Sequence, residues 1–254
     1  MTSVSAVVVS HNGADDLRVS LPALAPQVDE LVVIANVPGS AAGVPENVRV
    51  IENKRAQGFA ANANHGIAET SGEYVLLANP DAVPEADAVE RLRDFADARA
   101  RCGIAGPRMA GLDGELVPSR RRFPTVSGTL VRRTPLRRLL PPLERQRAHY
   151  HLGEDPAEPV QADWLLGGLM LLRRRMLEEL GGLDAGFRLY GEDIDLCYRA
   201  AKAGWERWYV PEARVRHEWK RETDRRFLTR RTWWHWRGVA RFVRKHPERL
   251  LALR

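Results

Sequence analysis

Cysteine is scarce in this chain of 254 residues, where only Cys102 and Cys197 occur. Two thiols at unrelated positions supply neither a disulfide framework nor a cysteine-based zinc site, so we expect two core thiols in a reducing compartment. Long apolar runs are also lacking, since none approaches the roughly 20 residues that span a bilayer. The N-terminal residues lack the basic start and the cleavage site of a signal peptide. We therefore expect a cytoplasmic protein, either soluble or peripheral on the inner face of the plasma membrane.

Two familiar phosphate-binding motifs are absent as well. No G-x-G-x-x-G follows the first apolar run, and the sequence has no Walker motif. Neither a dinucleotide-binding fold nor a phosphate-cradling loop is therefore indicated.

The apolar segments that are present alternate between strand-like and helix-like patterns. This alternation is typical of an α/β fold, with a mainly parallel central sheet flanked by helices. A basic, proline-rich stretch at 132–159 is expected to be a long loop. We expect strands at 4–10, 30–34, 48–52, 73–78, 103–109 and 207–210, and helices at 15–24, 60–70, 86–100, 174–180 and 194–203.

Polar residues follow the ends of three predicted strands. Ligands of parallel sheets bind beyond the carboxyl ends of the strands, so we expect these residues to share a binding site. They are His11 and Asn12, Ala35 and Asn36, and Asn79 to Asp81.

Positive charge is concentrated near the C-terminus. Residues 217–254 contain 12 Lys or Arg against 4 Asp or Glu, a net charge of +8, whereas the whole chain carries +6. Trp233, Trp236, Ala240 and Val243 recur three or four residues apart, which predicts a basic, aromatic, amphipathic helix. Such a helix either packs on the body of the protein or lies on an anionic membrane surface. A nucleic-acid partner has only this charge in its favour and is not expected.

Three carboxylates lie within four residues at Glu192, Asp193 and Asp195, directly after Gly191. Like charges this close repel, and they persist where a cation holds them or where one of them acts as a base. The alternative is the acidic first turn of a solvated helix, where carboxylates favour the helix dipole. The cluster by itself leaves both interpretations open.

Four stretches resemble, in order, the motifs of the inverting family 2 glycosyltransferases of the GT-A fold, especially the bacterial rhamnosyltransferase-like branch. They are residues 57–67 (QGFAANANHGI), 77–82 (LANPDA), 163–199 (from DWLLGG to YGEDIDLCYR) and 211–217 (PEARVRH). The resemblance implies one GT-A domain at 1–217, with a nucleotide-sugar half at about 1–110 and an acceptor half at about 111–217. A basic, aromatic helical extension follows at 218–254.

The resemblance also implies which residues bind the donor and a metal ion. A nucleotide-sugar donor leaves as a diphosphate, whose charge a divalent cation neutralises. Mg²⁺ or Mn²⁺ takes carboxylate oxygens and Mn²⁺ accepts a His, so Asp81 and His217 are the expected ligands. The expected donor-binding residues are Ser10, Asn12, Asn36, Gly58, Asn62, Asn79, Asp81 and Gly168.

On the acceptor side, the resemblance implies that Asp193 is the base that deprotonates the attacking hydroxyl. Glu192, Asp195 and Trp164 are expected to contact the acceptor or to orient Asp193. The basic stretch 120–122 (RRR) either meets phosphates of the donor or of a lipid, or forms a solvated turn.

The sequence departs from the family pattern in two places. Ala35 stands where an Asp commonly contacts the base of the donor. After His217, a stretch of small residues is replaced by EWKR, so phosphate contacts there would come from Lys220 or Arg221.

The leading hypothesis is an inverting, metal-dependent glycosyltransferase. It would move a sugar, with rhamnose from dTDP-rhamnose as the first candidate, onto a hydroxyl of a glycan or of a polyprenyl-diphosphate-linked saccharide. The alternatives are a nucleotide-sugar or carbohydrate-binding GT-A protein with weakened catalysis, and a sugar nucleotidyltransferase.

Overall fold

Strand β1 (Val4–Ser10) is buried along its whole length in the computed structural model, which describes residues 2–123, 155–217 and 229–250. A strand covered on both faces has no solvent side, which is why this run is mostly Val and Ala. β1 pairs in parallel with β2 (Glu30–Ala35) and β4 (Tyr74–Ala78). The three strands therefore present their carboxyl ends, and the polar residues that follow, at one edge of the sheet.

The central sheet combines parallel and antiparallel pairs. Its other strands are β3 (Arg49–Glu52), β5 (Ala82–Pro84), β6 (Cys102–Ala110), β7 (Leu116–Val117), β9 (Val160–Gln161), β11 (Leu169–Arg173) and β12 (Glu206–His217). Among the described residues the order is β3-β2-β1-β4-β11-β6-β12-β5, with β7 on β6 and β9 on β12. Pairing is parallel from β3 to β4 and between β6 and β12, while β11 is antiparallel to both neighbours. A separate small sheet joins β8 (Arg120–Arg121) to β10 (Trp164–Leu165).

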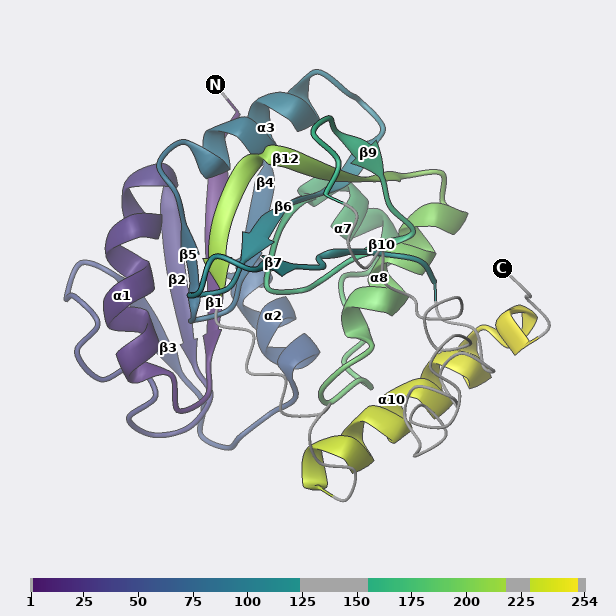
Figure 1. The fold of residues 1–254 in the computed structure, drawn as a ribbon. Coiled ribbons are helices and arrows are strands. Elements are labelled where there is room, and N and C mark those ends of the chain that lie inside the picture. Colours follow the sequence, from purple (N-terminus) through teal and green to yellow (C-terminus); the bar gives the residue numbers. More distant parts are fainter. Residues whose placement is uncertain (1, 124–154, 218–228, 251–254) are drawn as a thin grey trace.

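Helices cover both faces of the central sheet (Figure 1). Helices α1 (Ala14–Leu24) and α3 (Ala88–Asp97) pack on the face that carries Val4, Ala6 and Val8. Helices α2 (Phe59–Ala68), α7 (Arg174–Leu180) and α8 (Glu192–Lys202) pack on the face that carries Val7 and Val9. Successive β1 side chains thus enter opposite cores, as the two-residue repeat of a strand requires. Short 3₁₀ turns follow α1 (η1, Ala25–Gln27) and the last helix (η2, Pro247–Leu250).

The last helix, α10 (Arg230–Lys245), lies beside α8 rather than on the sheet (Figure 1). Phe242 is buried and meets the ring of Tyr198 on α8, with ring centroids 5.7 Å apart. Trp233 is 52% exposed. The helix therefore packs on the body of the protein, one of the two arrangements that its sequence allowed. Within the described ranges, none of the helices has the length and hydrophobicity needed to cross a bilayer.

The predicted elements of the first 110 residues are confirmed to within a few residues, whereas the second half differs. β5 and β11 are not among the predicted strands. β12 is a strand of 12 residues, longer than the strand expected at 207–210, because register shifts along its pairing with β6 interrupt its pattern. α8 begins at Glu192, two residues earlier than expected, so all three carboxylates lie in its first turn.

Close packing of α2 on β1 depends on Gly66. A Cβ at this position would lie 2.3 Å from Val7 Cγ1. Gly66→Ala is therefore expected to lower the unfolding free energy by roughly 1–3 kcal/mol through overpacking, as measured by urea denaturation. In a Val7→Ala background, where the contacted methyl is gone, the same change should cost much less. An equal cost in both backgrounds would contradict this packing.

Candidate active site

Strand pairing brings His217 to Asp81. β12 ends at His217 and runs antiparallel to β5, with His217 opposite Ala82. This register places His217 Nε2 3.3 Å from Asp81 Oδ1 and 3.3 Å from Asn79 Nδ2. The side chains of His217 and Asp81 are only 8% and 16% exposed. The unpredicted strand β5 is thus what joins the two expected metal ligands.

The Asp81–His217 pair fits a divalent cation. A carboxylate oxygen and an imidazole nitrogen at this separation can turn toward one ion, a donor set that suits Mn²⁺ and, through its oxygen, Mg²⁺. No group of three or more His, Cys, Asp or Glu side chains among the described residues forms a full metal cage. The remaining ligands would come from water and from phosphate oxygens, which is the usual arrangement for Mg²⁺ in sites that bind phosphates.

The dipeptide Gly167–Gly168 connects this pair to Asp193. Gly167 N donates to Asp193 Oδ2 at 3.3 Å, and Gly168 O accepts from Asn79 N at 2.9 Å. A Cβ at Gly168 would lie 3.2 Å from His217 Nε2, so a side chain here would press on the imidazole. The expected base and the expected metal ligands therefore flank one turn of the chain.

Glu192 and Asp193, the first two residues of α8, are buried carboxyl groups with different surroundings. Burial, followed by the negative charge of Asp193, raises the pKa of Glu192 to about 8, and Glu192 Oε2 has no hydrogen-bond partner among the described residues. Burial also raises the pKa of Asp193, but N–H groups of Ile194 and Gly167 and the charge of Arg121 offset part of this effect. At neutral pH Glu192 therefore holds its proton, whereas Asp193 has N–H donors and a cation that stabilise its charged form. Different surroundings of this kind are how sites assign separate acid and base roles to two carboxyl groups.

A network of side-chain amides lies at the carboxyl ends of β2 and β3. Asn36 Oδ1 accepts from Asn53 Nδ2 at 3.0 Å and from Gln57 N at 2.8 Å. Asn53 also donates to Asn62, whose own Nδ2 donates to Gly58 O at 3.0 Å. Three predicted donor residues, Asn36, Gly58 and Asn62, are thus brought together. Asn53 and Gln57 were not predicted, although Asn53 directly follows a strand and so fits the same rule.

The two donor candidates at the end of β1, Ser10 and Asn12, lie outside this amide network. Ser10 is fully buried and its hydroxyl donates to Ser40 O. Asn12 is exposed and has a positive φ of 61°. Between them, His11 Nδ1 lies 3.1 Å from Asn36 Nδ2 and links β1 to the amide network. Donor contacts of Ser10 and Asn12 stay predictions.

Trp164 supports Arg121 next to Asp193. The two residues face each other across β10 and β8, with the Arg121 guanidinium 5.0 Å from the centre of the indole ring. Trp164 is 6% exposed, and its indole N–H donates to Arg122 O at 2.7 Å. Its contact with an acceptor stays a prediction, as do phosphate contacts of Arg120 to Arg122. Lys220 and Arg221 lie outside the described residues.

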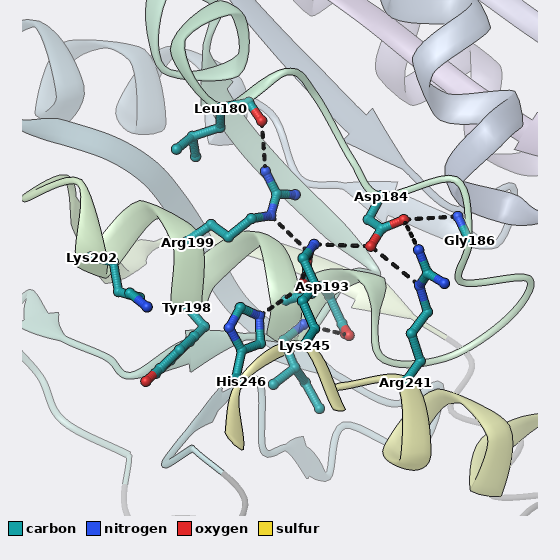
Figure 2. Close-up of polar contacts among 12 residues, drawn as sticks. Leu180, Asp184, Gly186, Asp193, Tyr198, Arg199, Lys202, Arg241, Lys245 and His246 are labelled. Atoms are coloured by element: carbon teal, nitrogen blue, oxygen red, sulfur yellow. Dashed lines mark hydrogen bonds and ion pairs between the residues drawn. The ribbon is translucent and has the colours of Figure 1, made fainter. Parts of the chain in front are cut away.

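Asp195 belongs to a separate cluster between α8 and α10. It is fully buried and lies 2.7 Å from Arg199 Nε, 2.9 Å from Lys245 Nζ and 2.8 Å from His246 Nε2. Figure 2 shows the Arg199, Lys245 and His246 side chains converging between the two helices. This geometry assigns Asp195 to the helix contact, and its predicted acceptor contact stays a prediction.

Asp184 extends the same cluster toward the loop before α8. Arg241 donates to Asp184 at 2.7 Å and Lys245 at 2.9 Å (Figure 2). Burial alone would raise the pKa of Asp184, but these hydrogen bonds hold it below its ordinary value. The two carboxylates, Asp184 and Asp195, thus hold α10 against the segment that leads to Asp193.

The proton on Glu192 links stability to pH. The folded state binds this proton more tightly than the unfolded chain does, so the unfolding free energy falls as pH rises from about 4.5 to about 8. Glu192→Gln removes this loss, and the Tm of the variant relative to wild type should rise by at least about 2 °C across that range. Scanning calorimetry at both ends measures the change, with the exposed Glu46→Gln as the matched control. A difference in Tm that is independent of pH would contradict the assignment.

Loss of the buried Asp195 charge should cost far more than loss of a surface charge. Asp195→Asn removes the buried carboxylate that Arg199, Lys245 and His246 share, and we expect a loss of about 3–5 kcal/mol of unfolding free energy. Glu248→Gln is the matched control, because Glu248 pairs with Lys202 at the surface and should have little effect. Urea denaturation of both variants compares them, and wild-type stability of Asp195→Asn would rule out the cluster as a structural anchor.

Comparison with known sequences shows which family this chain resembles. Residues 4–236 match the family described as "Glycosyltransferase like family 2". The N-acetylglucosaminyl-diphospho-decaprenol L-rhamnosyltransferase of Mycobacterium tuberculosis is 31% identical over 74% of this chain. The low-salt glycan biosynthesis hexosyltransferase Agl10 of Haloferax volcanii is 26% identical over 80% of it. The chain spans 66% and 62% of the lengths of these two relatives.

Solved structures share the fold at lower identity. GalNAc-T7, crystallised with UDP, GalNAc and Mn²⁺, superposes with a TM-score of 0.68 at 17% identity, over 96% of this chain and 48% of that one. The mannosyltransferase PcManGT from Pyrobaculum calidifontis, in complex with GDP-Man and Mn²⁺, gives 0.56 at 18% identity, over 87% and 58%. These likenesses confirm the predicted GT-A type of fold. The family match over residues 4–236 goes further, and the chain belongs to the family 2-like glycosyltransferases, as the order of its motifs predicted.

Proposed function

We propose that this protein is an inverting, metal-dependent glycosyltransferase that moves a sugar from a nucleotide donor to a hydroxyl of a glycan or of a polyprenyl-diphosphate-linked saccharide. The observation that carries the proposal is the placement of Asp193 and the Asp81–His217 pair on either side of Gly167–Gly168. The mycobacterial relative is named for transfer of L-rhamnose to a diphospho-decaprenol-linked sugar. Rhamnose from dTDP-rhamnose is therefore the first donor to test.

The reaction follows from the charges of the site. Asp193 takes the proton of the acceptor hydroxyl while that oxygen attacks the anomeric carbon, and the bond from this carbon to the donor diphosphate breaks on the opposite side. One displacement of this kind inverts the configuration. Asp81 and His217 would hold a divalent cation, which would supply positive charge to neutralise the charge that develops on the leaving diphosphate. Because Glu192 keeps its own proton at neutral pH, Asp193 is the carboxyl group of the pair that accepts the proton of the acceptor.

Donor recognition is assigned to the amide network. Ala35 supplies no carboxylate, so the base of the donor meets the hydrogen-bonding groups of Asn36, Asn53 and Gln57 instead. On this proposal residues 1–217 are the transferase domain, with the donor half at about 1–110 and the acceptor half at about 111–217. Although α10 packs on the body of the protein, Arg237 and Arg244 are exposed, and through such charges the basic extension at 218–254 holds the enzyme near the membrane surface that carries a lipid-linked acceptor.

A nucleotide-sugar-binding protein without turnover is the second candidate, and Ala35 is the observation in its favour. Thermal stabilisation by a nucleoside diphosphate and Mn²⁺, with no sugar released or transferred from any of a panel of nucleotide sugars, would favour it over the enzyme. Product formation with any of them would exclude it.

Amide substitution should greatly reduce activity at Asp193 and change it little at Glu192. Asp193→Asn removes the base and should lower kcat by about 10²–10⁴-fold with an unchanged KM for the donor. Glu192→Gln imitates the protonated acid that is already present, and should retain activity within about tenfold of wild type. Steady-state transfer assays at neutral pH compare the two. Full activity of Asp193→Asn, or equal loss in both variants, would contradict the assignment of the base.

The metal assignment predicts a change in cation dependence. Asp81→Asn and His217→Gln should each raise the half-saturating Mn²⁺ concentration at least about tenfold, because each removes one of two protein ligands. Asp29→Asn is the control, because the Asp29 carboxylate accepts a hydrogen bond from Val4 N and is not an expected metal ligand. Unchanged Mn²⁺ dependence of both ligand variants would place the cation elsewhere.

A further inference from the structure

A cavity of about 450 Å³ lies between α10 and the loop before α8, outside the site described above. This volume is within the range of small-molecule sites in proteins. Four arginines and one tryptophan dominate its lining, and glycine or alanine supplies most of the rest. The chief lining residues are Arg188, Trp234, Arg237, Gly238, Arg241 and Arg244.

Among the described residues, the positive charge of this groove is only partly compensated. Arg241 is paired with Asp184. No carboxylate among the described residues forms an ion pair with Arg188, Arg237 or Arg244. Cations gathered around one cavity repel each other unless an anion joins them. The groove is therefore electrostatically suited to a ligand with more than one negative charge.

Aromatic stacking holds two of these arginines in place. The Arg188 guanidinium lies 4.9 Å from the centre of a Trp234 ring, and that of Arg237 lies 4.8 Å from Trp233 and 5.5 Å from Trp234. A stacked guanidinium keeps its N–H groups directed outward in one plane, the geometry that binds phosphate oxygens in pairs. Ordered arginines of this kind favour phosphate over a diffuse attraction to any anion.

The groove is built onto the segment that carries the proposed base. Arg188 O accepts from Phe59 N at 2.9 Å, at the start of the donor-side helix α2. The backbone at Tyr190 approaches Gly238 of α10 so closely that a Cβ on Gly238 would lie 2.4 Å from Tyr190 O. Asp193 follows Arg188 by five residues, so their Cα atoms are at most about 18 Å apart. A ligand in the groove is thus near the acceptor side of the site.

We propose that this groove binds the diphosphate of a lipid-linked acceptor, while the attached saccharide extends toward Asp193. This assignment rests on the proposed function. The donor diphosphate has its own place at Asp81 and His217, which leaves the acceptor as the source of a second diphosphate. Trp233, 52% exposed on the same helix, offers apolar surface to the first isoprene units. Recognition by arginine needs no metal ion, unlike recognition at Asp81 and His217.

Isothermal titration of the full chain in EDTA tests the groove without turnover. Geranyl diphosphate serves as the soluble probe, and geraniol and dTDP serve as ligands that lack the diphosphate or the isoprenoid. We expect binding of geranyl diphosphate alone, weakened at least about tenfold in Arg237→Gln/Arg244→Gln, because two charge-assisted contacts are lost. Arg175→Gln/Arg214→Gln removes the same charge from exposed positions on α7 and β12 and should bind as wild type does.

Three results would overturn the proposal: no binding of geranyl diphosphate by wild type, equal loss in the two double variants, or equally tight binding of dTDP in EDTA. A transfer assay separates this outcome from failure of the proposed reaction. In Arg237→Gln/Arg244→Gln, KM for a diphosphate-linked acceptor should rise about tenfold while donor hydrolysis is unchanged. Groove binding without any turnover by wild type would keep the groove and refute the transferase.

Discussion

Asp195 is a fully buried carboxylate that joins two helices far apart in the sequence. Its oxygens bind Arg199 on its own helix and Lys245 and His246 at the end of α10. A buried charge is tolerated only when it is paired and hydrogen-bonded, so this position tightly fixes how α10 meets α8. Asp193 lies two residues earlier in the same helical turn, so the contacts that fix Asp195 also fix the position of Asp193. The first turn of α8 is therefore both a helix start and part of the candidate site, because Asp195 anchors the helix and Asp193 faces the site.

The site itself depends on how the sheet ends. β12 lies between β6 and the short strand β5 in the sheet, and its pairing with β5 places His217 beside Asp81. The turn at Gly167–Gly168 then lies between these ligands and Asp193, and the lack of side chains there lets the imidazole approach. Burial raises the pKa of Glu192, so this carboxyl group retains a proton beside Asp193. Strand register, two glycines and one buried proton together account for the proposed chemistry.

Much of this arrangement could be predicted from the sequence because it depends on local patterns. The apolar run at Val4–Ser10 predicts a buried strand of a parallel sheet, and the polar residues after the strands predict its ligand-binding edge. The order of the motifs indicates the family. Long-range pairing could not be read in this way. β5 is three residues long, and β12 is interrupted by register shifts, so neither shows a period that identifies its partner. Lys245 and His246 lie in a C-terminal stretch whose pattern predicts only a basic, amphipathic helix. No local pattern indicates that their side chains reach Asp195.

On the proposed function, the donor diphosphate, its cation and Asp193 meet at Gly167–Gly168. A crystal structure of the protein with dTDP and Mn²⁺, with the manganese located by its anomalous scattering, tests this arrangement. We expect one manganese ion bound to Asp81 Oδ1 and His217 Nε2, with the diphosphate beside Gly168 and the groove at Arg237 free of nucleotide. Manganese away from both residues, or dTDP bound in the α10 groove, would contradict it.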